Sequence, residues 1–298
     1  MLRGCITALV TPFKNGEIDW KSFEDLVGRQ LDAGVAGLSP CGTTGEAPAL
    51  SPQEHLSLIK KVVEMARGRA IVVAGCGANS TKKTIELAGE VEQLGVDALL
   101  VVTPYYNRPT QKGLFEHYSA LAKSVKTPIC IYNVPARTGT NIEPATVLKL
   151  AALFQRIVAI KEAAGSLDQV SALVRGSGKG FSVLSGDDSL TLPMLSVGAV
   201  GVVSVVSNIA ARELCDLISA WDQMDQEKAR RLHLKLFPLA KELFVETNPA
   251  PVKWALKRLG LIATDELRGP LVSLSREAEP RVQRALQDSG LLELREVA

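Results

Sequence analysis

The sequence predicts a (β/α)8 barrel followed by a small helical domain. Short runs rich in Val, Ile and Leu recur about every 20 to 34 residues, and each precedes a stretch with helical periodicity. The runs are apolar on both faces, which is typical of a parallel sheet covered by helices. Eight units in succession favour a closed barrel over an open doubly wound sheet. The turn at Leu9–Phe13 also lacks the glycine-rich nucleotide loop of that alternative.

The predicted elements alternate regularly along the chain. The strands are expected at residues 5–9, 36–39, 70–74, 98–102, 128–132, 157–160, 182–185 and 201–205. Helices are expected at residues 20–33, 52–67, 81–94, 112–125, 144–153, 167–174, 189–197 and 210–223. Several open with start signals such as Ser51-Pro52. Strand patterns stop after Asp222, so we divide the chain into a barrel over residues 1–224 and a helical domain over residues 225–298.

Composition excludes several classes of protein. The 298 residues are 46% hydrophobic and 22% charged with a formal net charge of +2, which excludes a disordered chain. Basic residues form pairs but no longer run, so a nucleic-acid partner is not expected. The apolar runs are strand-sized, far short of the roughly 18 residues that span a bilayer. The N-terminus does not resemble a signal peptide, and we expect a cytoplasmic protein with no membrane association.

The cysteines and histidines give no support to a metal site. Five cysteines without a CxxC motif predict free, mostly buried thiols in a reducing compartment. The three histidines are scattered, with no HExxH motif and no Cys/His cluster. We therefore expect chemistry that uses neither a metal nor another cofactor.

Polar side chains follow the predicted strands at the point where each strand ends. In a β/α barrel the reactive groups come from this face. The relevant segments are Gly42-Thr43-Thr44-Gly45-Glu46, Tyr105-Tyr106-Asn107, Tyr132 to Gly139, Lys161-Glu162 and Gly186-Asp187-Asp188. Hydroxyls, an amine and a guanidinium are therefore expected at one mouth of the barrel.

Lys161 is the strongest candidate for chemistry. It follows the apolar strand residues Ile157 to Ile160, where an unpaired ammonium is costly. It either forms a salt bridge to Glu162 or another acid, extends out of the barrel, or acts as a Schiff-base nucleophile. The last role needs a neutral amine. An ordinary lysine is neutral in only about one molecule in 2,500 at pH 7, and burial favours the neutral form.

Three further candidates each have a structural and a functional interpretation. Tyr132 either packs as a strand-end aromatic or transfers protons near an imine. The pair Thr43-Thr44 forms either an ordinary turn or a cradle of hydroxyl and amide donors for a carboxylate. Arg137 is either solvated or binds a carboxylate through its planar fork.

These motifs together resemble the dihydrodipicolinate synthase family. The resemblance rests on Gly42 to Glu46, Tyr105 to Asn107, Tyr132 to Pro135 with Arg137 to Gly139, Ile160 to Ala163 and Ser185 to Asp188. It extends from Gly4 to about Pro251 and includes Glu246-Thr247-Asn248-Pro249. It implies a metal-free (β/α)8 lyase that condenses pyruvate with L-aspartate 4-semialdehyde in the diaminopimelate route to lysine.

The resemblance also implies residue roles and an assembly. The catalytic positions would be Lys161 as the imine-forming amine, with Tyr132, Thr43 and Tyr106 as the proton relay, Tyr106 reaching in from a neighbouring subunit. The substrate-binding positions would be Thr44 for the pyruvate carboxylate, Arg137 for the semialdehyde carboxylate, and Gly186 and Val203 along the pocket. The family implies a homotetramer built as a dimer of dimers.

Two alternatives stay open at this point. Sister pyruvate-dependent aldolases, such as N-acetylneuraminate lyase or a 2-keto-3-deoxy sugar acid aldolase, share the lysine and tyrosine. Arg137 favours the synthase, because sugar acids have no amino-acid carboxylate for it to bind. A barrel that has lost catalysis and serves as a scaffold is disfavoured by the intact Lys161, Tyr132 and Thr43.

The resemblance also bears on regulation. In lysine-inhibited members an acidic residue on the helix after the third strand pairs with the effector's ammonium. That position here is Lys83. Like charges repel, so we expect weak or absent inhibition by L-lysine.

Overall fold

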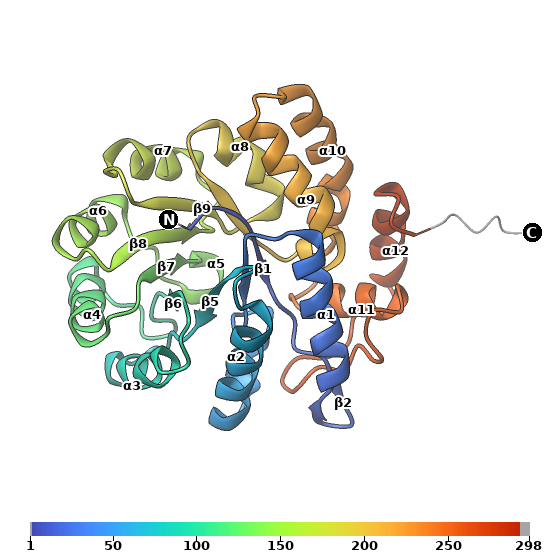
Figure 1. Ribbon diagram of the computed structural model, residues 1–298, viewed down its shortest axis with the longest axis horizontal. Coiled ribbons are helices and arrows are strands. Elements are labelled where there is room, and N and C mark those ends of the chain that lie inside the picture. Colours follow the sequence, from blue (N-terminus) through green and yellow to red (C-terminus); the bar gives the residue numbers. More distant parts are fainter. Residues whose placement is uncertain (1, 293–298) are drawn as a thin grey trace, which may run out of the picture.

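The computed structural model describes residues 2–292 and contains a closed barrel of eight parallel strands (Figure 1). The strands are β1 (Gly4–Ala8), β4 (Gly37–Ser39), β5 (Ile71–Gly75), β6 (Ala98–Val102), β7 (Ile129–Asn133), β8 (Ile157–Glu162), β9 (Ser182–Ser185) and β10 (Gly201–Ser204). They follow one another around the ring, and β10 pairs with β1 to close it. The predicted fold class is confirmed.

Helices surround the ring of strands (Figure 1). They are α1 (Trp20–Ala33), α2 (Pro52–Ala66), α3 (Thr81–Glu92), α4 (Gln111–Ser124), α6 (Pro144–Leu153), α7 (Leu167–Gly176), α8 (Thr191–Ser196) and α9 (Ser207–Asp222). At the start of α2, the Ser51 hydroxyl accepts from the Glu54 amide and the Glu54 carboxylate accepts from the Ser51 amide. The α9 helix begins at Ser207 rather than at the predicted Ala210, where the backbone kinks.

The structure contains a short hairpin and a single helical turn that were not predicted from the sequence. A two-stranded hairpin, β2 (Phe13–Lys14) with β3 (Glu17–Ile18), follows β1. Its turn residues Asn15 and Gly16 both have positive φ, which is typical of the Asn-Gly turns that connect hairpin strands. A single turn of helix, α5 (Pro135–Thr138), follows β7.

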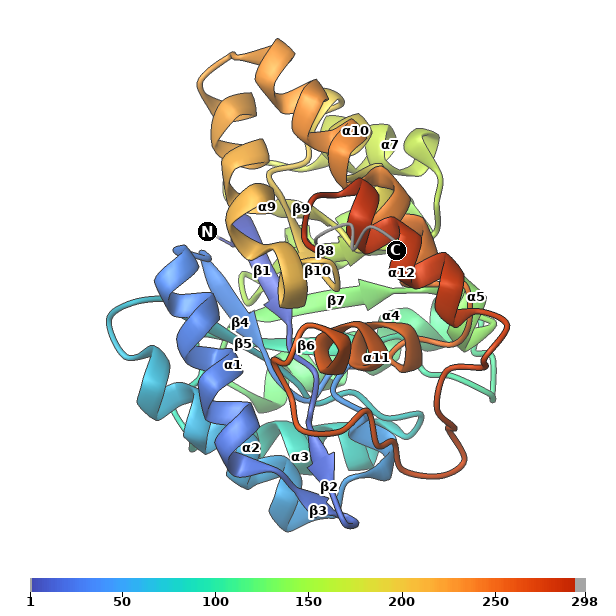
Figure 2. The same ribbon diagram turned by 90° about the vertical axis from the view of Figure 1, so that its right-hand side faces the viewer.

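The C-terminal part of the described chain is helical and contains no strand from residue 225 to residue 292. Its helices are α10 (Gln226–Glu242), α11 (Ala250–Arg258) and α12 (Glu279–Asp288). Figure 2 shows this segment, coloured orange to red, along one side of the barrel. The helical content agrees with the prediction, and the domain boundary at residue 224 stays a prediction. No helix in residues 2–292 has the length and apolar character needed to cross a membrane.

Two apolar clusters make up the core of the barrel. The larger lies between the strands and the helices, and it includes Ile131, Ile157 and Ile160. The smaller fills the inside of the ring with alternate residues of the strands. Its members include Ile6, Val73, Leu100, Cys130, Tyr132, Ala159, Leu184 and Val203.

The β8 strand departs from strict alternation near its start. Its register with β7 shifts between Ile129 and Cys130, which pair with Ile157 and Ala159 respectively. Val158 is the extra residue, and it packs against the inner cluster as Ala159 does. This is the geometry of a β-bulge. After the bulge, Tyr132 lies directly opposite Lys161.

All five cysteines are free, as predicted. Cys5, Cys41, Cys76 and Cys130 are buried, and Cys215 is partly buried. Burial in apolar surroundings raises the pKa of Cys76 to about 12. Thiols held in this way are poor nucleophiles, so they have a packing role.

Candidate active site

Lys161 and Tyr132 meet at the C-terminal ends of β8 and β7. Both residues are buried, with 6% and 7% of their surface exposed. The Lys161 Nζ lies 4.2 Å from the centroid of the Tyr132 ring. The amine is therefore enclosed, and an aromatic hydroxyl-bearing side chain covers it.

Glu162 does not neutralise this amine. Its carboxylate accepts hydrogen bonds from the Asn133 Nδ2 at 3.0 and 3.1 Å, from the Gln169 Nε2 at 2.9 Å and from the Ala164 amide at 2.7 Å. Burial raises the pKa of Glu162, and these hydrogen bonds oppose the rise. Within residues 2–292, none of the ion pairs involves Lys161. The salt-bridge interpretation of Lys161 is therefore wrong.

Gly186 gives the lysine stem the room that it occupies. A Cβ at this position would lie 2.7 Å from the Ala163 Cβ, 3.1 Å from the Lys161 Cγ and 3.2 Å from the Glu162 carbonyl oxygen. Real Cβ atoms rarely come this close to their neighbours. A side chain at position 186 would therefore crowd the Lys161 stem, and the pocket role of Gly186 stays a prediction.

Val203 lies in the barrel interior. It is 1% exposed and belongs to the inner cluster together with Tyr132. The predicted pocket residues on β10 and β7 therefore belong to the same interior.

A cavity of about 340 Å³ opens beside Tyr132. Thr43, Tyr132 and Arg137 all line it, together with mostly apolar side chains. Three of the residues that the sequence singled out thus share one cavity. Lys161 is not among the lining residues, but its Nζ lies 4.2 Å from the centroid of the Tyr132 ring, which does line the cavity.

The loop after β4 carries both threonines. Thr44 is 3% exposed, and its Oγ1 accepts a hydrogen bond from the Asn248 Nδ2 at 3.0 Å. The Arg137 guanidinium donates to the Asn248 carbonyl oxygen at 3.3 Å. Asn248 therefore connects two predicted site residues. We did not predict this contact, although the motif Glu246 to Pro249 was a usable signal.

Tyr106 is the one predicted catalytic residue that a single chain does not bring to the site. It is 90% exposed and has a φ of 73°. The cavity wall contains its neighbour Tyr105 instead. The predicted role of Tyr106 in a neighbouring subunit is not tested by one chain.

Asp188 has a structural role at the same mouth. Its carboxylate accepts from the backbone amides of Val205 and Val206 at 2.9 and 3.1 Å. It therefore supports the start of α9. Among residues 2–292, no three His, Cys, Asp or Glu side chains gather as a metal site would require.

A closed β/α barrel with a buried lysine, a tyrosine and paired threonines at the C-terminal ends of its strands is typical of the (β/α)8 barrel enzymes. Comparisons with known proteins give the particular family. The model of the dihydrodipicolinate synthetase family matches residues 1–289. The chain belongs to this family.

Three relatives illustrate the similarity. The 4-hydroxy-tetrahydrodipicolinate synthase of Syntrophus aciditrophicus (strain SB) is 48% identical over 98% of this chain and 100% of its own length. The structure of the synthase from Methylacidiphilum fumariolicum SolV is 47% identical with a TM-score of 0.95, covering 97% of this chain and 96% of that one. The Cyanidioschyzon merolae enzyme, solved with lysine bound, is 39% identical with a TM-score of 0.94, covering 97% and 99%. These relatives favour the synthase over the sister aldolases.

Proposed function

We propose that this chain condenses pyruvate with L-aspartate 4-semialdehyde to give 4-hydroxy-tetrahydrodipicolinate and water. The proposal agrees with the names of the relatives. The observation that carries the mechanism is the buried Lys161 amine, which forms no ion pair with a carboxylate of residues 2–292 and lies against the Tyr132 ring. A lysine attacks a carbonyl as the neutral amine, and burial in general favours the neutral form.

The first half of the reaction activates pyruvate. The Lys161 Nζ attacks C2 of pyruvate, and the C2 oxygen leaves as water after two proton transfers. The resulting imine then loses a proton from C3 and becomes an enamine. Tyr132, whose ring centroid lies 4.2 Å from the amine, transfers these protons together with Thr43, which lines the same cavity as Tyr132. The hydroxyl and amide of Thr44 hold the pyruvate carboxylate, so C2 faces the amine.

The second half joins the two substrates. The enamine carbon attacks the aldehyde carbon of the semialdehyde, whose oxygen takes up a proton and becomes the 4-hydroxyl group. The substrate's own amino group then displaces Lys161 from C2, which closes the ring and frees the enzyme. Arg137 binds the semialdehyde carboxylate, and its contact with the Asn248 carbonyl fixes the guanidinium at the mouth.

Trapping of the imine tests this proposal. Incubation with pyruvate and borohydride should add one reduced pyruvate to Lys161, located by peptide mass spectrometry. Lys161→Ala should remove both the adduct and most of the turnover while leaving the circular dichroism spectrum unchanged. An adduct on Lys179 or Lys253 instead would overturn the mechanism.

The assembly and the compartment belong to the same proposal. A homotetramer would give Tyr106 a place in a neighbouring active site, and the exposed aromatic residues Tyr105 and Tyr106, adjacent in the sequence, support an interface at this loop. Sedimentation velocity measures the oligomeric state, and a monomer at micromolar concentration would contradict it. The free cysteines support a cytoplasmic location.

A further inference from the structure

The loop that carries Thr43 and Thr44 ends in a buried carboxylate bound from both sides. Glu46 is 2% exposed and has a left-handed backbone with a φ of 55°, which is uncommon for a residue other than glycine. Its Oε1 accepts from the Lys253 Nζ at 2.7 Å, and its Oε2 accepts from the Arg268 amide at 3.0 Å. We call Glu46, Lys253 and Arg268 the Glu46 clamp.

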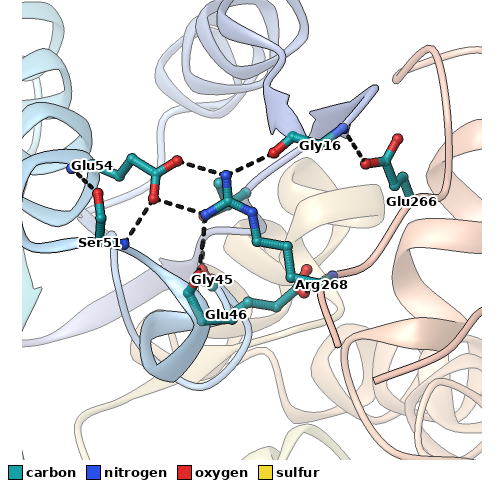
Figure 3. A network of polar contacts seen from close by, with 9 residues as sticks. Gly16, Gly45, Glu46, Ser51, Glu54, Glu266 and Arg268 are labelled. Atoms are coloured by element: carbon teal, nitrogen blue, oxygen red, sulfur yellow. Dashed lines mark hydrogen bonds and ion pairs between the residues drawn. The ribbon is translucent and has the colours of Figure 1, made fainter. Parts of the chain in front are cut away.

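The clamp joins residues that are far apart in the sequence. Lys253 lies on α11, and Arg268 lies in the segment between α11 and α12. Figure 3 shows the Arg268 guanidinium between Glu54 at the start of α2 and the backbone of Gly16 in the β2–β3 turn. It donates to the Glu54 Oε2 at 2.7 Å and to the Gly16 carbonyl oxygen at 2.8 Å. The clamp thus connects the loop after β4 to α11 and, through Arg268, to the start of α2 and to the β2–β3 turn.

Arg268 also contacts the segment that follows Glu46. Its Nη1 donates to the Ala49 carbonyl oxygen at 3.1 Å, three residues beyond Glu46. On the other side of Glu46, the Thr11 hydroxyl donates to the Gly45 carbonyl oxygen at 2.8 Å. The backbone on both sides of Glu46 is therefore fixed by groups outside the loop.

A buried ion pair adds little to the free energy of unfolding, because the cost of removing both charges from water can exceed their mutual attraction. The Lys253 and Glu46 side chains are both 0% exposed, so both charges have lost their hydration. Burial lowers the pKa of Lys253, and the attraction of Glu46 opposes this effect. Replacement of such pairs by apolar residues is often neutral or stabilising in other proteins. The pair is better explained by the geometry that it imposes.

The cations of the clamp share an aromatic support. The Lys253 Nζ and the Arg268 Cζ each lie 4.4 Å from the centroid of the Phe13 ring. Phe13 is fully buried, so this ring provides a fixed surface for both charges.

We propose that Lys253 and Arg268 are positioning residues for pyruvate binding, which they control through Glu46. They hold the Thr43-to-Glu46 loop in the conformation that presents the Thr44 hydroxyl and amide to the pyruvate carboxylate. This inference rests on the proposed function of the site. We expect loss of the clamp to weaken pyruvate use more than semialdehyde use, because the Arg137 guanidinium donates to the Asn248 carbonyl oxygen and not to the Thr43-to-Glu46 loop.

The test compares two lysines on the same helix. Lys253→Met removes the buried cation and keeps an apolar chain of similar length. Because a displacement of 1 Å costs up to about 100-fold, kcat/KM for pyruvate should fall about 10- to 100-fold, and the KM for semialdehyde should change less than threefold. Lys257→Met is the matched control. Its exposed ion pair with Asp265 at 2.8 Å has no contact with Glu46, so both constants should stay within twofold of wild type.

A double variant separates positioning from stability. Glu46→Gln combined with Lys253→Met leaves no unpaired buried charge, so its thermal midpoint should recover toward that of wild type. Its kcat/KM for pyruvate should stay as low as in Lys253→Met, since the loop has lost its anchor. If Lys253→Met does not fold, this double variant carries the kinetic test. Pyruvate kinetics that recover together with the thermal midpoint would show that the clamp is only structural.

Borohydride trapping distinguishes the two levels of the proposal. Wild type that forms no pyruvate adduct on Lys161 would refute the proposed function. If wild type forms the adduct but Lys253→Met has the same kcat/KM for pyruvate as wild type, only the positioning role is refuted.

Discussion

Gly186→Ala tests whether the free space beside Lys161 matters for catalysis. The added methyl group would start 2.7 Å from the Ala163 Cβ and 3.1 Å from the Lys161 Cγ. Contacts become ordinary at 3.4 Å, so Ala163 must retreat by about 0.7 Å (3.4 minus 2.7) and the lysine stem by about 0.3 Å (3.4 minus 3.1). The Glu162 backbone oxygen at 3.2 Å limits the room for this relaxation.

Both stability and rate should respond to this substitution. Overpacking costs about 1–3 kcal/mol, which lowers the thermal midpoint by roughly 2–10 °C. A displacement of about 0.3 Å along the Lys161 stem should reduce kcat/KM for pyruvate roughly 4-fold, since a displacement of 1 Å costs up to about 100-fold. Stopped-flow imine formation at a temperature where the variant is fully folded measures the second effect alone.

Gly178→Ala is the matched control for this experiment. Gly178 lies between α7 and β9, and no heavy atom beyond its chain neighbours lies within 4 Å of a Cβ built there. The control should keep both wild-type stability and wild-type rates. A folded Gly186→Ala variant that forms the imine at the wild-type rate would refute the packing argument.

Three more predictions concern other parts of the molecule. Arg137→Ala should slow condensation with the semialdehyde by roughly 10- to 150-fold, because a charged hydrogen bond contributes about 1.5–3 kcal/mol. Borohydride trapping of the pyruvate imine should stay normal. Equal losses in both steps would contradict this division of roles. Millimolar L-lysine should hardly change initial rates at saturating pyruvate, because Lys83 stands where an acid is needed, and clear inhibition below a few millimolar would show that interpretation to be wrong. The Arg268 guanidinium lowers the pKa of Glu54 from 4.5 to about 2, so this pair stabilises the folded state fully above about pH 4.5 and loses that effect as the pH falls through about 2. The stability gap between wild type and Glu54→Gln, from urea unfolding at several pH values, should therefore close over that range, and a constant gap would argue against the pair.

The sequence was sufficient to predict the barrel because each strand has a recognisable pattern within a few consecutive residues. Each is a short apolar run with a helix after it, and a closed parallel sheet follows from their number. The hairpin at Phe13–Ile18 escaped this pattern because each of its strands has only two residues. Its Asn15-Gly16 turn was the available signal.

The site was predictable only where its residues end strands. Lys161 and Tyr132 follow apolar runs, so their burial could be predicted from their place in the sequence. Lys253 offered no such signal, since it lies in a helix among other basic residues and resembles a solvated surface lysine. Its partner Glu46 is 207 positions away, and only the folded chain brings the two together.

The extra residue Val158 decides which way the Lys161 amine faces. Ile157 packs toward the helices, and strict alternation would send every second residue after it, Lys161 included, in the same direction. The one extra residue reverses this alternation for the residues after it, so the amine points into the barrel instead. Single-residue insertions or deletions between Ile157 and Lys161 would therefore abolish the chemistry without touching any reacting group, whereas a two-residue change would preserve the orientation. The number of residues between Ile157 and Lys161 must therefore stay odd for the amine to face the barrel interior, whatever the identities of the side chains around it.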